Sequence, residues 1–254
     1  MRTNPNLRIQ DGFKIPLLCS SCEKLLNAFE TPFAREIFYP LHKEDKFRLK
    51  YRDWCLKFAV SVSWRSLLYL LNYAEDNGPP FPEEVSASIN AALELWRKFL
   101  LGKKRNPGKF EQHLLPLAQI QSFTGDKNLP DFIHRYFFLS VDVDVAWNEE
   151  RAFVYTKMCR IILFGRLYDV KPKMWKGLKV SANRGIIGPK TMKIGQDTLN
   201  YIFSRVKNAA LMENSLSEVQ KEKIHKSSQK DINRILSSET MRAWDYDNKI
   251  NSKH

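Results

Sequence analysis

Residues 51–73 read YRDWCLKFAVSVSWRSLLYLLNY, and this stretch decides the fold class. Its larger side chains recur every three or four residues, which is the spacing of one face of an α-helix. The sequence Asn77-Gly78-Pro79-Pro80 follows and should end the helix, because glycine and proline disfavour its continuation. The stretch therefore predicts a long, packed helix. The residues that recur near helical spacing are Trp54, Phe58, Ser61, Val62, Leu68 and Leu71.

Three further helices are predicted in the first hundred residues. A helical pattern begins at Cys22, and Thr31-Pro32 is typical of an N-cap followed by proline in the first turn, which predicts a separate short helix through Phe38. Residues 40–46 are polar and predict a loop. Acidic residues after Pro82 favour the start of another helix, and a glycine follows its predicted end at residue 102.

The second half of the chain mixes two periodicities. Residues 136–147 alternate, with valines 141, 143 and 145 on one side and polar side chains on the other, which predicts a half-buried strand. Residues 153–167 form an apolar run whose length favours a buried helix. Residues 178–187 predict a hairpin that turns at Asn183-Arg184-Gly185.

Two helices are predicted to finish the chain, over residues 196–212 and 216–236. Ser215 is followed three residues later by Glu218, which is the capping-box pattern of a helix start. The last dozen residues are polar and are expected to fray.

Together these patterns predict a mainly α fold of the α+β class in two parts. Residues 1–102 are expected to form a helical part that begins with a zinc-knuckle-like CxxC. Residues 110–254 are expected to form a mixed α+β part, with a few strands or a hairpin after residue 130 and two terminal helices. The basic loop at 103–109 is the expected boundary.

The net charge of +13 is the strongest compositional signal, and it is concentrated. Residues 166–207 contain ten lysines and arginines but only two acidic residues, so this basic segment alone carries +8. Residues 103–109 add four cations and no acid. Clustered cations favour a polyanionic partner, because each neutralised phosphate releases condensed counterions.

The predicted partner is therefore a nucleic acid, either DNA or RNA. Trp175 is included among the contacts, because an aromatic ring between lysines can stack on a base. Two alternatives remain open: a basic surface that only keeps the protein in solution, and an interaction subunit whose basic face docks an acidic protein. The candidate nucleic-acid-binding residues are Lys103, Lys104, Arg105, Lys171, Lys173, Trp175, Lys176, Lys179, Arg184, Lys190 and Lys193.

The sequence Cys19-Ser20-Ser21-Cys22 is the one recognisable chemical motif. Two cysteines separated by two residues form half of a tetrahedral zinc site, so Cys19 and Cys22 are the candidate metal ligands. No second CxxC, CxxH or HxxxH occurs, which leaves Cys55, Cys159 and His42 as possible completions. Inert reduced thiols and a redox pair remain alternatives to zinc.

The composition also argues against several classes of protein. No run of about 18 uncharged apolar residues occurs, so no membrane span is expected. The opening sequence MRTNPNLRIQDG lacks the apolar centre of a secretory signal. Four cysteines in 254 residues, two of them in a CxxC, argue against a disulfide-stapled secreted domain. The predicted location is the cytoplasm.

Residues 8–26 read RIQDGFKIPLLCSSCEKLL. This segment resembles a family of uncharacterised bacterial proteins that share LLCxxCE followed by an acidic-aromatic helix. Phe29-Glu30, Phe33 and the later FAVSVSWR at 58–65 fit the same family, so the resemblance covers roughly the first 70 residues. Members of the family begin with an upstream CxxC and a Ser-His-Ile-Ile-Pro segment, which together resemble the treble-clef zinc fold of HNH endonucleases.

The resemblance implies that Cys19 and Cys22 bind zinc, and it suggests a component of a bacterial antiviral defence or mobile-element system. Only eleven residues precede Gly12, so the upstream CxxC and the histidine segment are missing from this sequence. An HNH nuclease needs a histidine base beside a metal-binding His or Asn. No histidine precedes Cys19, so a working HNH site is not expected here. A partner protein that completes the zinc site is the corresponding expectation.

No catalytic constellation is recognisable, and whether the chain is an enzyme stays open. Nuclease activity is the best-fitting candidate, since Asp142 and Asp144 on a predicted strand, with Lys157 downstream, resemble part of a metal-dependent nuclease core. The usual Glu-x-Lys is lacking, and solvated strand carboxylates are the alternative. The sequence thus predicts a nucleic-acid-binding protein with zinc as its candidate cofactor.

Overall fold

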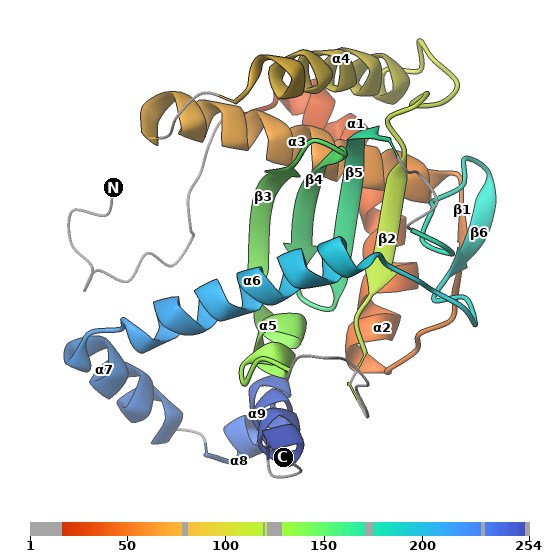
Figure 1. The fold of residues 1–254 in the computed structure, drawn as a ribbon. Helices are drawn as coiled ribbons and strands as arrows, with labels where there is room; N and C mark the ends of the chain where they lie inside the picture. Colours follow the sequence, from red (N-terminus) through yellow and green to blue (C-terminus); the bar gives the residue numbers. More distant parts are fainter. Residues whose placement is uncertain are drawn as a thin grey trace. The chain divides into compact units, whose positions relative to one another are not determined.

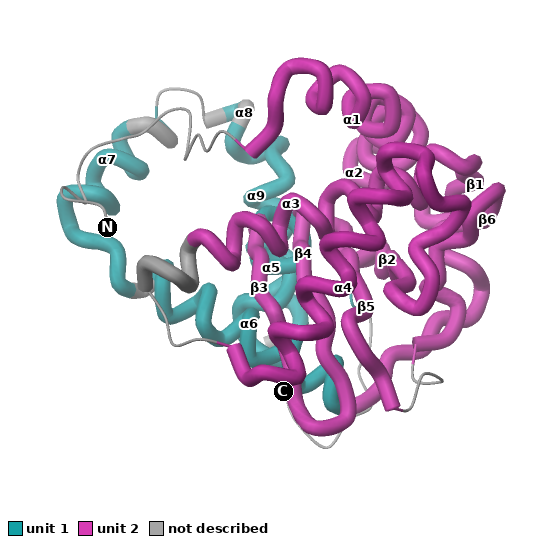
Figure 2. The backbone as a smooth tube through the Cα atoms, turned by 90° about the horizontal axis from the view of Figure 1, so that it is seen from above, with its two compact units in different colours: residues 1–16, 119–139, 197–254 teal, residues 17–118, 140–196 magenta. Residues whose placement is uncertain are grey.

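The computed structural model describes residues 17–77, 81–118, 120, 129–170, 175–229 and 232–251. The chain forms two compact units (Figure 2). Unit 2 comprises residues 17–118 and 140–196, and unit 1 takes its described residues from 119–139 and 197–254. The loop at 103–109 lies inside unit 2, so the units divide the chain differently from the two parts expected. Helix accounts for 54% and strand for 19% of the described residues, which confirms a mainly α fold of the α+β class.

Unit 2 is built around a four-stranded antiparallel sheet with the strand order β2-β5-β4-β3. Helix α3 (Trp54–Asn77) packs against β3, β4 and β5, and α4 (Glu83–Leu100) packs on α3 and β5 (Figure 1). The strands are β2 (Gln112–Pro116), β3 (Val141–Trp147), β4 (Arg151–Met158) and β5 (Ile161–Asp169).

The apolar run at 153–167 forms β4 and β5, so the buried helix predicted there is wrong. Every residue from 151 to 157 is buried, and a strand buried on both faces lacks the alternation that distinguishes it from a buried helix. Gly165 allows β5 to approach the helices closely, because a Cβ there would lie 2.8 Å from the Ser63 hydroxyl and 3.0 Å from the Trp96 ring. The chain turns between the two strands at Cys159, which has φ 48°.

β3 forms an edge of the sheet and is only partly buried. The strand predicted at 136–147 begins at Val141, because α5 (Ile133–Leu139) takes the first part of that segment. Val145 is buried, whereas Val141 is 73% exposed. The valine side of this strand is therefore covered along only part of its length.

The N-terminal helices run almost without a break through α1 (Ser20–Phe33), the π-helical segment η1 (Ala34–Phe38) and α2 (Tyr39–Lys43). Pro32 lies inside α1, so Thr31-Pro32 does not open a separate helix, and the wider π-helical turns begin just after the proline. The loop expected at 40–46 begins as helix. Phe33 stacks on Phe58 of α3 with ring centroids 3.6 Å apart, which joins α1 to the core of unit 2.

A two-stranded ribbon stands apart from the main sheet. β1 (Leu49–Arg52) and β6 (Arg184–Ile187) pair antiparallel (Figure 1). The hairpin predicted at 178–187 is therefore wrong, since the partner of β6 is a strand far earlier in the chain. Strands before residue 130 also contradict the expectation that all of them follow it. The helix predicted at 51–73 begins at Trp54, because the preceding residues belong to β1.

Unit 1 is helical in its described residues. Asp247 joins α9 to α5, since its carboxylate accepts hydrogen bonds from the backbone N–H of His134 at 2.7 Å and from Nε of Arg135 at 3.0 Å. The fraying expected for the last dozen residues is contradicted as far as residue 251, where α9 ends, and residues 252–254 lie outside the described residues. The helices are α5, α6 (Gln196–Asn214), α7 (Glu218–Gln229), α8 (Ile232–Leu236) and α9 (Glu239–Asn251).

Within the range 216–236, where one helix was predicted, the structure describes α7 and α8, and residues 230–231 between them lie outside the described residues. The capping box lies two residues later than expected, on Ser217 and Gln220. The Gln220 N–H donates to the Ser217 hydroxyl, and the Ser217 N–H donates to the Gln220 side-chain oxygen. None of the helices in the described ranges combines the length and apolar character needed to cross a membrane.

Candidate nucleic-acid interface

One side of the β1/β6 ribbon is exposed and carries cations. Alternate residues of β1 are buried, which leaves Lys50 and Arg52 exposed. The antiparallel register places Arg52 directly opposite Arg184, and residues that lie opposite each other point to the same side of a ribbon. We refer to Lys50, Arg52 and Arg184 as the basic face.

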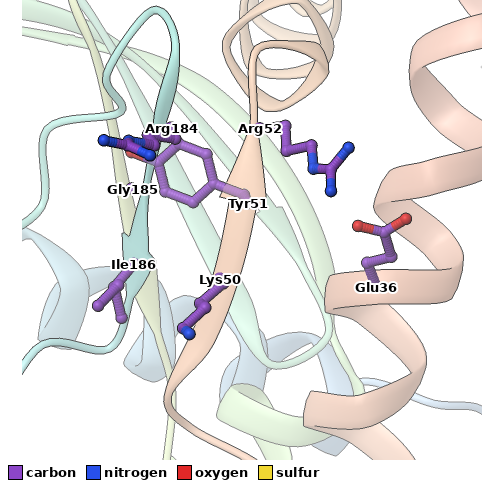
Figure 3. Close-up of a pocket in the computed structure, with 7 residues that line it drawn as sticks. All are labelled: Glu36, Lys50, Tyr51, Arg52, Arg184, Gly185 and Ile186. Atoms are coloured by element: carbon purple, nitrogen blue, oxygen red, sulfur yellow. The ribbon is translucent and has the colours of Figure 1, made fainter.

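An open depression of about 600 Å³ adjoins the basic face (Figure 3). Figure 3 shows the two guanidinium groups extending away from each other, with that of Arg52 directed toward Glu36. Glu36 itself forms an ion pair with Arg35 at 2.8 Å. None of the three cations of the basic face has an ion-pair partner among the described residues. The residues that line the depression are Glu36, Lys50, Tyr51, Arg52, Arg184, Gly185 and Ile186.

Tyr51 and two glycines hold the ribbon in register from its buried side. The Tyr51 hydroxyl accepts a hydrogen bond from the backbone N–H of Ser181 at 2.8 Å, and burial raises the pKa of Tyr51. Its ring occupies the space beside Gly185, where a Cβ would lie 2.2 Å from the hydroxyl oxygen. Gly188 has φ 68°, and a Cβ there would collide with the carbonyl oxygen of Phe47. The strand pairing therefore depends on residues that carry no charge.

β6 belongs to an arm formed by residues 176–193. The arm is closed by a backbone bridge, in which the N–H groups of Lys176 and Lys193 each donate to the other's carbonyl oxygen at 3.0 Å. The arm contains five cations and no acidic residue. Lys190 is also exposed within it. The arm of unit 2 thus contains five of the candidate nucleic-acid-binding residues: Lys176, Lys179, Arg184, Lys190 and Lys193.

Lys179 and Arg166 are engaged within the protein. The Lys179 Nζ lies 2.5 Å from one carboxylate oxygen of Glu111, and the Arg166 Nη2 lies 3.3 Å from the other. His113, whose Nε2 is 3.5 Å away, and these two cations hold the pKa of Glu111 at about 2. Burial lowers the pKa of His113. These contacts attach the arm to β2 and β5, so we do not count Lys179 in the basic face.

Trp175 lies in the interior of unit 2, which contradicts its predicted role of stacking on a base. Its ring stacks on Phe164 with centroids 5.0 Å apart, meets Phe153 edge to face, and is only 8% exposed. Lys171 and Lys173 lie outside the described residues.

Lys103, Lys104 and Arg105 are exposed in the loop that follows α4. They remain available to a partner, although they belong to neither strand of the ribbon. Lys50 and Arg52 belong to the ribbon, but they were not among the residues predicted from the sequence. The alternation Leu-Lys-Tyr-Arg at 49–52 was the available signal for a short half-buried strand.

Cys19 and Cys22 lie at the N-terminus of α1. The Cys19 Sγ lies 3.0 Å from the Ser21 hydroxyl, and this hydrogen bond lowers the pKa of Cys19 to about 7. In the described part of the chain, no three His, Cys, Asp or Glu side chains come close enough to hold a metal. Cys55 is buried in α3 and Cys159 lies at the β4–β5 turn. The donor set present is therefore half of a zinc site, and further ligands would have to come from elsewhere.

The residues that resembled a nuclease core have structural partners. Lys157 is fully buried, and its amine donates to the carbonyl oxygens of Ser140 at 3.0 Å and Cys159 at 2.5 Å. Burial lowers the pKa of Lys157 to about 7. Asp142 lies opposite Lys157, whereas Asp144 lies opposite Tyr155. This geometry favours a packing role for Lys157 over a catalytic one.

Comparisons of the chain with protein-family models, with curated proteins and with solved structures give no match. The basic face is therefore interpreted from its own geometry and charge.

Proposed function

We propose that this chain is a nucleic-acid-binding protein and that the basic face contacts the phosphate backbone. The observation that carries the proposal is the cross-strand pair of Arg52 and Arg184, with Lys50 on the same side and no ion-pair partner for any of them in the described ranges. Like charges directly opposite each other destabilise a strand pair. A bound phosphate chain supplies the negative charge that these side chains lack.

Three further features of the chain support the proposal. The net charge of +13 favours association with polyanions at a distance, and the arm at 176–193 and the loop at 103–109 add exposed cations in the same unit. Zinc held by Cys19 and Cys22 and completed by a partner protein is part of the proposal, as is a cytoplasmic location. A role in bacterial defence or mobile elements is supported only by the family resemblance of the first 70 residues or so.

The proposal can be tested by removing the arginine pair and measuring the salt dependence of binding. Arg52→Gln/Arg184→Gln deletes two phosphate contacts, so the slope of log K against log salt should fall by about 1.8. If parent and variant bind equally at 1 M salt, this change in slope makes the variant bind about 60-fold more weakly than the parent at 0.1 M salt. Fluorescence anisotropy with labelled DNA at several salt concentrations gives both numbers.

A matched control removes the same charge elsewhere. Lys221 and Lys226 of α7 are each ion-paired with a glutamate of their own helix, at 2.8 and 2.7 Å. Lys221→Gln/Lys226→Gln should therefore leave the slope almost unchanged. If both double variants behave alike, net charge and not the basic face governs binding.

Two other outcomes decide between the alternatives. A parent protein that binds neither DNA nor RNA, but binds an acidic protein in a salt-dependent way, would replace this proposal with a docking subunit. Metal-dependent cleavage of the labelled DNA would indicate a nuclease, and the cleavage site would then have to be sought outside the basic face.

A further inference from the structure

We infer that the ligand of the basic face is the sugar–phosphate backbone of a nucleic-acid double helix, bound without reading the bases. This inference rests on the proposed function and narrows it to one class of nucleic acid. It follows from which side chains line the depression, which are absent from it, and how the strand pairing places the cations.

The described lining of the depression offers no ring on which an unpaired base could stack. Proteins that bind single strands typically combine a basic groove with exposed aromatic side chains that stack on successive bases. Tyr51 supplies the only ring among the lining residues, and it is 4% exposed. Its hydroxyl is already engaged by Ser181, and Trp175 lies in the core. Such a surface matches a ligand whose bases are already stacked and paired, with its phosphates outermost.

The chemistry of the exposed side chains also indicates backbone contact. Lys50, Arg52 and Arg184 are donors only, and the remaining exposed side chain of the ribbon, Ile186, is aliphatic. Contacts to phosphates position a protein on a duplex, whereas sequence is read by contacts to base edges. We therefore expect affinity that varies little with base sequence.

The strand pairing of the ribbon fixes the backbone positions of its cations. The strand register places Arg52 and Arg184 opposite each other, and in this pairing Gly185 and Gly188 leave no room for a Cβ beside Tyr51 and Phe47. The two guanidinium groups extend in different directions, which lets them meet separate phosphates (Figure 3). A double helix is a regular array of charge, so a pre-organised surface can bind it at a low cost in ordering.

The experiment compares one duplex with its own separated strand. The full chain is titrated into labelled DNA of about two helical turns, as duplex and as single strand of equal length, and into an RNA duplex of the same sequence. The inference predicts that either duplex binds at least about ten-fold more tightly than the single strand, and that two unrelated duplex sequences bind alike. It also predicts that the slope of log K against log salt is about 0.9 per phosphate contact for the B-DNA duplex, whereas a single strand gives about 0.7 per contact.

Tyr39 provides a variant that separates stacking from backbone contact. It is 54% exposed at the start of α2, three residues beyond Glu36, yet it does not line the depression. Tyr39→Ala should leave duplex affinity within about two-fold of the parent, because phosphate contacts need no aromatic partner. A large loss in this variant would overturn the inference in favour of stacking.

The remaining outcomes separate failure of the inference from failure of the proposed function. Equal or tighter binding of the single strand, still weakened by Arg52→Gln/Arg184→Gln, would overturn the duplex inference and leave nucleic-acid binding intact. Strong sequence preference among duplexes would overturn the claim that bases are not read. Absence of binding to every nucleic acid would overturn both.

Discussion

Replacing Gly185 by alanine tests whether the geometry of the ribbon, and not only its charge, presents the basic face. The added Cβ would stand 2.2 Å from the Tyr51 hydroxyl oxygen and 2.4 Å from the ring carbon that bears it, so the ring must move. Moving it breaks the hydrogen bond from Ser181, at a cost of about 1 kcal/mol, and overpacks the buried side, at about 1–3 kcal/mol. The free energy of unfolding should therefore fall by about 2–4 kcal/mol.

A second glycine serves as the control for this variant. Gly102 has φ 73°, but no atom lies within 4 Å of the position of its Cβ. Gly102→Ala should cost about 1–2 kcal/mol through the left-handed backbone alone and should leave DNA binding unchanged. Urea denaturation and anisotropy measured on both variants provide the comparison. Gly185→Ala does not change the net charge, so any loss of binding would come from geometry. If this variant has the stability and the DNA affinity of the parent, the packing argument is refuted.

Three further predictions concern groups away from the ribbon. Glu111→Gln should lower the free energy of unfolding at neutral pH, and this difference from the parent should vanish as the pH falls from 4.5 to about 2, because the native carboxylate loses its contribution over that range. A difference that does not change with pH in urea melts would contradict this. The free energy of unfolding of the parent should rise between pH 7 and about 10.5, because the unfolded chain binds more protons than the native one over that range. Lys157→Met should remove this rise, and parallel pH profiles for parent and variant would argue against it. If Cys19 and Cys22 bind zinc in a site that a partner protein completes, chelator-free preparations of the chain with its copurified partner should hold about one zinc per chain, and Cys19→Ser should hold none. A metal-free complex would favour inert thiols.

The long helices could be predicted from the sequence because their larger side chains recur at helical spacing, although all six residues from Phe58 to Ser63 of α3 are buried. The helical spacing at 54–71 corresponds to α3, and Gly102, with φ 73°, follows the end of α4 at Leu100. β4 and β5 could not be predicted, because a run buried on both faces has no alternation, and its length alone favoured a helix. The pairing of β1 with β6 joins segments far apart in sequence, and no local pattern encodes a partner at such a distance.

The candidate site was predicted by charge but not by geometry. Arg184 was named from the basic segment, whereas Lys50 and Arg52 were missed, although residues 46–52 hold four cations and no acid, as residues 103–109 do. Lys179 was assigned to the partner because sequence does not show that Glu111 faces it. Trp175 was misplaced for a related reason, since a tryptophan between lysines gives no indication of whether its ring packs inward.

Footprinting of lysine acetylation tests the central claim most directly, because it reports where on the chain the nucleic acid lies. The protein is acetylated with and without a saturating random-sequence DNA duplex, and modification is measured at each lysine by mass spectrometry. The account predicts that Lys50 is protected by the duplex, while the ion-paired Lys221 of α7 is modified at the same rate in both samples. Unchanged modification of Lys50 under saturating duplex, with protection elsewhere, would contradict the claim that the basic face binds nucleic acid.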